Sequence, residues 1–159
     1  MTDNFFKKRK NVEQVEESTE FAPKFNKDGL IPVVTTDYES GEVLMQSYMN
    51  KESLTKTIQL GEAVYYSRSR KALWHKGKIS GLIQKIKEIR IDDDQDCLWL
   101  KVSVIGGASC HIGYRSCFYR SVPFKNLKNE SKIILRFKES KKIFNPKKIY
   151  GNTPNPTKL

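Results

Sequence analysis

Residues 92–117 read DDDQDCLWLKVSVIGGASCHIGYRSC. The stretch holds four aspartates, all three cysteines and one of the two histidines of the chain. Its middle part, residues 97–105, alternates apolar and polar side chains, which predicts a half-buried strand between an acidic turn and a cysteine-rich loop. Carboxylates suit Mg²⁺, whereas thiolates and imidazole suit Zn²⁺. We therefore interpret the stretch as a metal-binding region; the alternative is an acidic turn followed by buried cysteines.

The length and composition of the chain are those of one ordinary globular domain. It has 159 residues, of which 38% are hydrophobic and 30% charged, and no run approaches the ~18 apolar residues of a membrane span. The basic N-terminus is not followed by an apolar segment, so we expect no secretory signal. Three cysteines do not make a disulfide framework. We therefore expect a cytoplasmic protein that has reduced thiols and no membrane partner.

Positive charge is concentrated toward the C-terminus. The formal net charge is +11, and residues 123–159 contain ten Lys or Arg against two Glu. We divide the chain into a polar N-terminal arm (1–20), a central domain (21–122) and a basic C-terminal extension (123–159). A basic extension can bind phosphate polymers without sequence preference; the alternative is a solvated segment that only aids solubility.

The pattern of the central domain predicts an α+β fold that is β-dominant, with short antiparallel strands and one clear helix. Residues 31–37 and 42–48 read as a hairpin, and Asn50 and Gly61 are expected to begin and end the helix. Further strands are predicted at 64–67, 84–92 and 97–105 and at Phe118–Tyr119. In the extension, residues 133–135 suggest a strand, and Pro146 suggests a helical turn.

A basic loop, residues 67–81, mixes arginine and serine side chains with glycines. Guanidinium groups pair with phosphate oxygens, and glycine lets backbone N–H groups approach them. We therefore predict phosphate binding here, with Trp74 able to stack on a base. The alternative is an exposed basic loop with Trp74 packed beneath it. The candidate substrate-binding residues are Ser67, Arg68, Ser69, Arg70, Trp74, Lys76 and Ser80, with Arg115 from the cysteine-rich stretch.

The metal ligands divide into two sets. In a straight strand Asp92, Asp94 and Asp96 would be ~6.7 Å apart, too far for one Mg²⁺. The backbone must therefore curl there, or the ion is shared with substrate phosphates and waters. Cys110 and Cys117 supply two thiolates for zinc.

Two thiolates leave a zinc tetrahedron incomplete. Asp93, Cys97 and His111 are the candidates for a third ligand. Three protein ligands and one water would make a catalytic zinc site. His111 would then suit a general base, the alternative being a structural histidine.

Ordered blocks between Phe21 and Arg120 resemble the phosphoribosyl-AMP cyclohydrolase family of histidine biosynthesis. They are residues 28–32 (DGLIP), 41–45 (GEVLM), 48–50 (YMN), 67–70 (SRSR), 73–74 (LW), 76–77 (KG), 80–81 (SG) and 84 (Q), followed by 110–111 (CH), 113 (G) and 116–120 (SCFYR). The resemblance implies hydrolysis of the adenine ring of phosphoribosyl-AMP between N1 and C6. It implies a homodimer whose zinc sites take ligands from both subunits, with zinc on Cys110 and Cys117 and Mg²⁺ on Asp92, Asp94 and Asp96.

The sequence departs from the family at the third zinc ligand. The family usually has cysteine where this chain has Asp93, and Cys97 comes four residues later. Alignment favours Asp93, whereas the softness of sulfur favours Cys97; we expect Asp93. Because the matching blocks end at Arg120, we also expect residues 138–159 of the basic extension to be dispensable for catalysis.

The second functional hypothesis is a basic nucleic-acid-binding module with a structural zinc, in which Trp74 and tyrosines stack on bases. The clustered aspartates disfavour it, because carboxylates repel a phosphate backbone unless a cation intervenes. We therefore expect no nucleic-acid partner.

Overall fold

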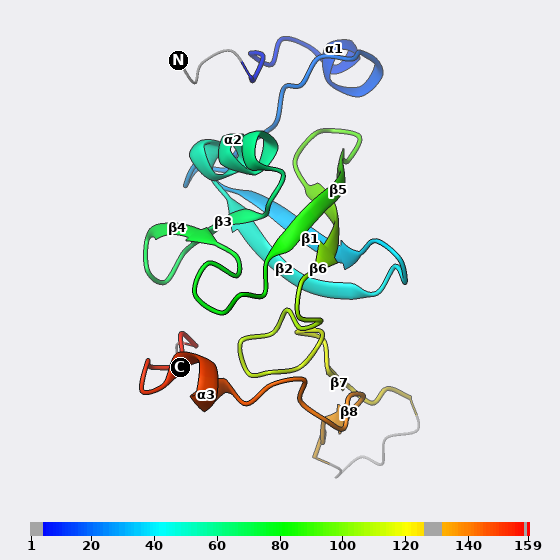
Figure 1. The fold of residues 1–159 in the computed structure, drawn as a ribbon. Coiled ribbons are helices and arrows are strands. Elements are labelled where there is room, and N and C mark those ends of the chain that lie inside the picture. Colours follow the sequence, from blue (N-terminus) through cyan, green and yellow to red (C-terminus); the bar gives the residue numbers. More distant parts are fainter. Residues whose placement is uncertain (1–4, 126–131, 158) are drawn as a thin grey trace.

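The computed structural model describes residues 5–125, 132–157 and 159. The described part is α+β with strands dominant, as the sequence predicts (Figure 1). The elements in chain order are α1 (Val12–Glu17), β1 (Ile31–Asp37), β2 (Val43–Met49), α2 (Lys51–Leu60), β3 (Val64–Ser67), β4 (Ala72–His75), β5 (Gln84–Ile91), β6 (Leu98–Val104), β7 (Arg120–Ser121), β8 (Arg136–Phe137) and α3 (Pro146–Tyr150).

The main sheet has the strand order β2-β1-β6-β5. Two antiparallel hairpins, β1–β2 and β5–β6, are joined by a parallel pairing of β1 with β6, in which Val33 lies beside Leu98. The expectation of antiparallel strands is therefore wrong for this central pair. β1 and β6 have the strongest buried alternation, so they take the two inner positions. The long connection through α2 and the β3–β4 ribbon lets β6 run parallel to β1.

The N-terminal segment folds against the acidic turn. Gln95, which is buried in that turn, accepts the N–H of Ala22 at 2.8 Å and donates to the carbonyl of Val15 at 2.9 Å. These bonds hold α1 at the end of the β5–β6 hairpin (Figure 1). The predicted polar arm therefore contains a helix that the sequence pattern did not reveal; its residues 1–4 lie outside the described ranges.

The C-terminal segment lies on the opposite side of the main sheet from α1 (Figure 1). The core strand predicted at Phe118–Tyr119 is wrong, because Phe118 is 58% exposed and β7 begins only at Arg120. Residues 133–135 are exposed and lie outside any strand, whereas Pro146 begins α3 as predicted. Residues 126–131 of the extension lie outside the described ranges.

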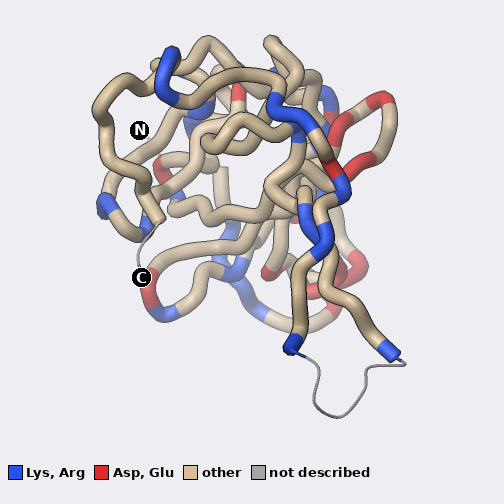
Figure 2. The backbone as a smooth tube through the Cα atoms, turned by 90° about the horizontal axis from the view of Figure 1, so that it is seen from below, with Lys and Arg blue, Asp and Glu red and all other residues tan. Residues whose placement is uncertain are grey.

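Charged residues are spread over the described chain. Figure 2 shows Lys and Arg at scattered positions over the visible backbone, with Asp and Glu at others. Among the described helices, none combines the length and the apolar character that a membrane crossing requires.

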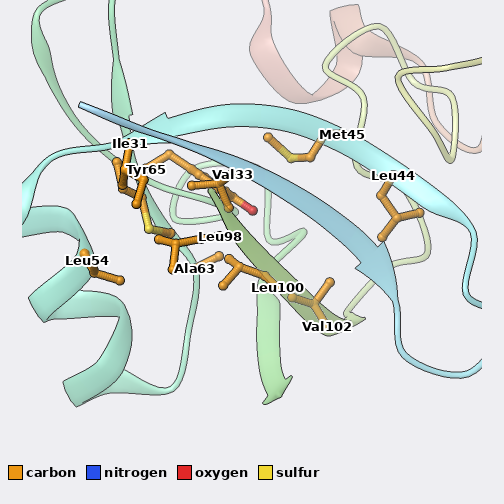
Figure 3. Packing of buried hydrophobic residues seen from close by; sticks show 11 residues of the cluster. Ile31, Val33, Leu44, Met45, Leu54, Ala63, Tyr65, Leu98, Leu100 and Val102 are labelled. Carbon is orange, nitrogen blue, oxygen red and sulfur yellow. The ribbon is translucent and has the colours of Figure 1, made fainter. Parts of the chain in front are cut away.

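The core lies between the main sheet, α2 and β3. It contains side chains of β1 and β6 such as Val33 and Leu100, together with Leu54 of α2 and Tyr65 of β3 (Figure 3). The Tyr65 hydroxyl is fully buried; it donates to Gln84 Oε1 at 2.7 Å and lies 2.7 Å from Thr35 Oγ1. Burial raises the pKa of Tyr65 far above its usual value, so the hydroxyl stays protonated. The buried polar groups are thus paired inside the core.

Helix α2 forms where the sequence predicts it. Asn50 and Ser53 make a capping box at its start, and Gly61 ends it with a positive φ of 66°. β3 and β4 then form a separate two-stranded sheet. β4 lies inside the predicted basic loop, so the part of that loop without regular structure is shorter than expected.

Candidate functional site

The three alternating aspartates lie in the tight turn between β5 and β6. Asp92 Oδ1 accepts the N–H groups of Asp96 at 2.9 Å and Cys97 at 3.0 Å, and Gln95 has a left-handed backbone with φ 58°. The backbone therefore curls, which is one of the two arrangements that the sequence argument left open. As a result, one carboxylate oxygen from each of Asp92, Asp94 and Asp96 lies within 4.8 Å of the other two.

This acidic turn, residues 92–97, is suited to a hard divalent cation. Hydrogen bonding with Asp92 raises the pKa of Asp96, and burial and repulsion from Asp92 and Asp94 raise it further. A cation among the oxygens would relieve that repulsion. Two oxygens bound to opposite sides of Mg²⁺ would be ~4.2 Å apart, so small side-chain rotations would make the three oxygens fit.

The cysteine loop, residues 106–118, is held against the opposite end of the sheet. The N–H of Cys117 donates to the carbonyl of Leu44 in β2 at 2.7 Å. Within the loop, the N–H of Cys110 donates to the carbonyl of Tyr114 at 3.1 Å. The loop therefore has a defined backbone that presents Cys110, His111 and Cys117 together.

The two cysteines of this loop form a hydrogen-bonded pair of reduced thiols. The bond from Cys117 lowers the pKa of Cys110 to about 7, against the effect of burial and with further help from the N–H of Ile112 and from Lys76. The same bond, together with the negative charge of ionised Cys110, raises the pKa of Cys117. One sulfur is thus easily ionised and the other shares its proton, which makes the pair a ready donor set for a soft metal.

Lys76 lies beneath the cysteine loop rather than facing solvent. Its side chain is buried, and Nζ donates to the carbonyl of Ser109 at 2.5 Å and lies 4.9 Å from the centre of the Trp74 ring. Burial lowers the pKa of Lys76, while Cys117 and Cys110 raise it. The predicted substrate-binding lysine is therefore placed as a positive charge beside the two sulfurs.

His111 lies between the two cysteines in sequence and is half-buried. Burial lowers its pKa, although a hydrogen bond with Asn155 opposes that shift. Nε2 lies 3.2 Å from Asn155 Oδ1. A ring with a lowered pKa is neutral at pH 7, which is the form a general base needs.

The basic loop presents its two arginines on the surface. Arg68 lies over the ring of Tyr48, 4.2 Å from its centre, and Arg70 Nε donates to Ser67 Oγ at 3.3 Å. Ser69 Oγ lies 3.4 Å from Ser67 Oγ. The serine and arginine side chains of residues 67–70 therefore form one exposed polar cluster, of the kind that binds phosphate.

Three other predicted substrate-binding residues are occupied by contacts within the chain. Trp74 packs against Tyr65, with ring centres 5.7 Å apart. Ser80 Oγ accepts the N–H of Leu82 at 3.2 Å. Arg115 reaches the β1–β2 turn and forms an ion pair with Glu42, in which Nε lies 2.7 Å from Oε2. The N–H of Nε does not point at this oxygen, so the contact is not a hydrogen bond.

Strand β6 separates the acidic turn from the cysteine loop. The seven residues of β6 begin at the turn and lead to the loop, a length of ~20 Å. Gln84, at the far end of β5 from the turn, donates to Ser109 Oγ at 3.2 Å, which places the loop at that end. The predicted hard and soft ligands, which are neighbours in sequence, are therefore apart in space. Asp93 and Cys97 lie too far from Cys110 and Cys117 of the same chain to share a metal with them.

Two features of the site could not be identified from the sequence. One is the burial of Lys76, which the sequence placed in an exposed phosphate-binding loop, and the other is the contact of His111 with Asn155, which lies 44 residues later in the extension. A two-residue apolar run, Leu73–Trp74, lies just before His75 and Lys76 and is only a weak sign that Lys76 is buried. Asn155 has no comparable signal, because its partner is brought to it only by the tertiary fold.

Comparison with known proteins gives a consistent result. A family model described as phosphoribosyl-AMP cyclohydrolase matches residues 45–119. A relative from Rhodopseudomonas palustris is 49% identical over 139 residues, covering 87% of this chain and 90% of its own length. Relatives from Nitrobacter winogradskyi (46% identity; 89% and 94% covered) and Desulforapulum autotrophicum (50%; 79% and 95%) are similar in extent. All three carry the name phosphoribosyl-AMP cyclohydrolase.

Proposed function

The chain belongs to the phosphoribosyl-AMP cyclohydrolase family, and from this premise we propose how its residues carry out the reaction. It is a hydrolase of histidine biosynthesis. Water adds across the N1–C6 bond of the adenine ring of phosphoribosyl-AMP, and the ring opens to the formimino-aminoimidazole carboxamide ribonucleotide. The residues therefore have to supply an activated water, a proton acceptor and contacts for two phosphate groups.

Cys110 and Cys117 are the zinc ligands in this proposal. Their hydrogen-bonded thiols, the lowered pKa of Cys110 and the nearby charge of Lys76 all favour thiolate ligation. Bound zinc supplies a water whose pKa lies near 7. His111 takes a proton from the water that attacks C6, and its lowered pKa keeps it in the accepting form at pH 7.

The third zinc ligand comes from a second copy of the chain. Since β6 holds the acidic turn ~20 Å from the cysteine loop, no residue of that turn reaches the thiols of the same chain. Asp93 is the better candidate, because its side chain is exposed and open to a partner. Burial and the neighbouring Asp92 and Asp96 raise the pKa of Cys97, which disfavours its thiolate.

A homodimer is also supported by apolar side chains near β7 and β8. Four of them are more than half exposed: Phe118 (58%), Val122 (61%), Phe124 (79%) and Phe137 (62%). Such a group of exposed apolar residues is typical of a protein–protein interface. It lies next to the cysteine loop, where a shared zinc site requires the subunits to meet.

Magnesium and the phosphates complete the site. Asp92, Asp94 and Asp96 would hold Mg²⁺, which would neutralise charge on the substrate phosphates. Ser67, Arg68, Ser69 and Arg70 bind the phosphate oxygens. A cytoplasmic location stays a prediction.

The observation that carries this proposal is the paired thiols with His111 beside them in one loop. The test is an absorbance assay of zinc- and Mg²⁺-loaded protein with phosphoribosyl-AMP. We expect His111→Ala to keep its zinc and lose ~10²–10⁴-fold in kcat, the usual contribution of a general base. His75→Gln changes the other histidine, which pairs with Glu62, and serves as the control. Full turnover by His111→Ala, or loss of its zinc, would contradict the assigned role.

The nucleic-acid-binding alternative has lost its main support. Trp74 packs on Tyr65 instead of standing free to stack on a base. Outside the basic extension, residues 1–122 hold 19 Lys or Arg against 16 Asp or Glu, so their charges are nearly balanced. Neither feature favours binding of a phosphate polymer.

A further inference from the structure

The C-terminal segment folds back onto the cysteine loop. The N–H of Ile143 donates to the carbonyl of Gly113 at 2.7 Å, and Lys142 Nζ lies 5.7 Å from the ring centre of Tyr114. In Figure 1 the yellow loop after β6 lies between the sheet and the orange C-terminal segment. The basic extension therefore contacts the loop that contains the proposed zinc ligands.

After this contact the chain reverses through α3. The ring of Phe144, just before the helix, packs edge-on against Tyr150 at its end, with centres 6.2 Å apart. The N–H of Thr153 then donates to the carbonyl of Tyr150 at 3.0 Å and turns the chain back. The residues that follow return to His111.

Asn155 forms two hydrogen bonds through the same atom. Its Oδ1 accepts the backbone N–H of Thr157 at 2.9 Å and lies 3.2 Å from Nε2 of His111. Because a backbone N–H can only donate, the shared atom of Asn155 is the oxygen and an acceptor. Nε2 of His111 must then carry the hydrogen. In the neutral ring this leaves the lone pair on Nδ1, which no described residue contacts by a hydrogen bond.

We propose that Asn155 is a positioning residue of the active site, which holds the His111 ring as its Nε2–H tautomer and so makes Nδ1 the atom that accepts the proton. The inference rests on the proposed function for the role of His111. As the water attacks C6, its O–H bond breaks and an Nδ1–H bond forms. The resulting imidazolium keeps its Nε2–H bond to Asn155. The extension, which the sequence suggested was dispensable, thus supplies part of the site.

The first test reads the tautomer directly. Two-bond ¹H–¹⁵N correlation spectra of the zinc-loaded, full-length protein distinguish protonated from unprotonated ring nitrogens, and His75→Gln assigns the two histidines. At a pH where the ring is neutral, we expect hydrogen on Nε2 in the wild type and a mixture of tautomers in Asn155→Ala. Hydrogen on Nδ1 in the wild type, or an unchanged single tautomer in Asn155→Ala, would overturn the inference.

The second test reads the reaction. Asn155→Ala should lower kcat by about 10-fold or more and change KM by less than about twofold, because it alters the base and not the phosphate contacts. Asn155→Asp keeps an accepting oxygen and should return kcat to within about threefold of the wild type. Asn152→Ala, in the same exposed segment, is the matched control. If Asn155→Ala behaves like Asn152→Ala, or if Asn155→Asp is as slow as Asn155→Ala, Asn155 has no positioning role.

The two proposals fail in different ways. Undiminished turnover by His111→Ala would overturn the proposed function, because the ring would then not be the base. In that case the spectra of the wild type and of Asn155→Ala still decide whether Asn155 holds the ring. If His111→Ala is slow but Asn155→Ala changes neither tautomer nor kcat, only the inference about Asn155 is wrong.

Discussion

Gly113 is the residue at which the C-terminal segment contacts the cysteine loop most closely. A Cβ atom there would lie 2.3 Å from the carbonyl oxygen of Phe144, and its φ of +101° is one that other residues rarely adopt. We expect Gly113→Ala to lower the free energy of unfolding by more than the ~1–3 kcal/mol that an unfavourable φ costs alone. Urea unfolding of the variant and the wild type measures this free energy.

Gly107→Ala is the matched control for this change. Gly107 also has a positive φ, +75°, but a Cβ atom at that position would meet no other atom within 4 Å. The difference between the two variants therefore reports the collision with Phe144. Equal losses of unfolding free energy in the two variants would show that the C-terminal segment does not pack on Gly113.

Lys76 is expected to tune the thiol of Cys110. A buried positive charge stabilises the nearby thiolate, so Lys76→Met should raise the pKa of Cys110 above its value of about 7. In the metal-free variant, the rate of alkylation of the Cys110 thiol should then rise at a higher pH than it does in the metal-free wild type. A Cys97→Ser background removes the one cysteine outside the loop. If the midpoint pH of Cys110 alkylation is unchanged, the Lys76 side chain contributes packing and not charge at this site.

The sequence allowed candidate site residues to be named, but it did not predict their contacts. Cys110, His111 and the three aspartates could be selected because ligand chemistry and spacing are local properties. The burial of Lys76 and the bond between Asn155 and His111 could not, because each depends on a segment far away in the chain. Closeness in the sequence was also misleading, because it suggested that the aspartates and cysteines lie together in space.

Within the acidic turn, single aspartates can be substituted to test which of them bind Mg²⁺. Asp94→Asn removes one of the three clustered oxygens and should weaken the Mg²⁺ dependence of turnover several-fold, while zinc per subunit stays unchanged. Mg²⁺ binding to the turn should also weaken as the pH falls through the raised pKa of Asp96, because protons then compete with the cation for the carboxylate. Magnesium titration of activity and metal analysis measure both.

Asp93→Asn separates the two metals in the same turn. Asp93 lies outside the cluster, so its change should leave the Mg²⁺ titration intact. If Asp93 is the zinc ligand, zinc per subunit should fall. Loss of zinc in Asp94→Asn with a normal Mg²⁺ response would require the two sites to be reassigned.

Elements that depend on local signals were predicted well, and those that depend on distant contacts were not. α2 lies between Asn50 and Gly61 because capping is decided by the residues at its two ends. β4 was missed because its four residues lie within a basic stretch, and it forms only by pairing with β3. The parallel pairing of β1 with β6 has no local sequence signature either.

At the scale of the whole molecule, a zinc site shared between subunits predicts complementation. Cys110→Ser damages the cysteine loop, and the double variant Asp93→Ala, Cys97→Ser damages the turn. Each homodimer alone should be inactive. After subunit exchange, a mixed dimer has one site with an intact loop from one chain and an intact turn from the other, so activity and zinc should return. Two variants that stay inactive when mixed would show that each site lies within one chain.

The parallel contact between β1 and β6 also determines the order in which the chain can fold. Each hairpin forms from neighbouring residues within microseconds, but Val33 meets Leu98 only after the whole connection through α2 and the β3–β4 ribbon has closed. During synthesis, β1 therefore leaves the ribosome several seconds before its inner partner. Through that interval one edge of a largely apolar strand is open to other chains. Translation speed and chaperone supply should accordingly affect the yield of folded enzyme.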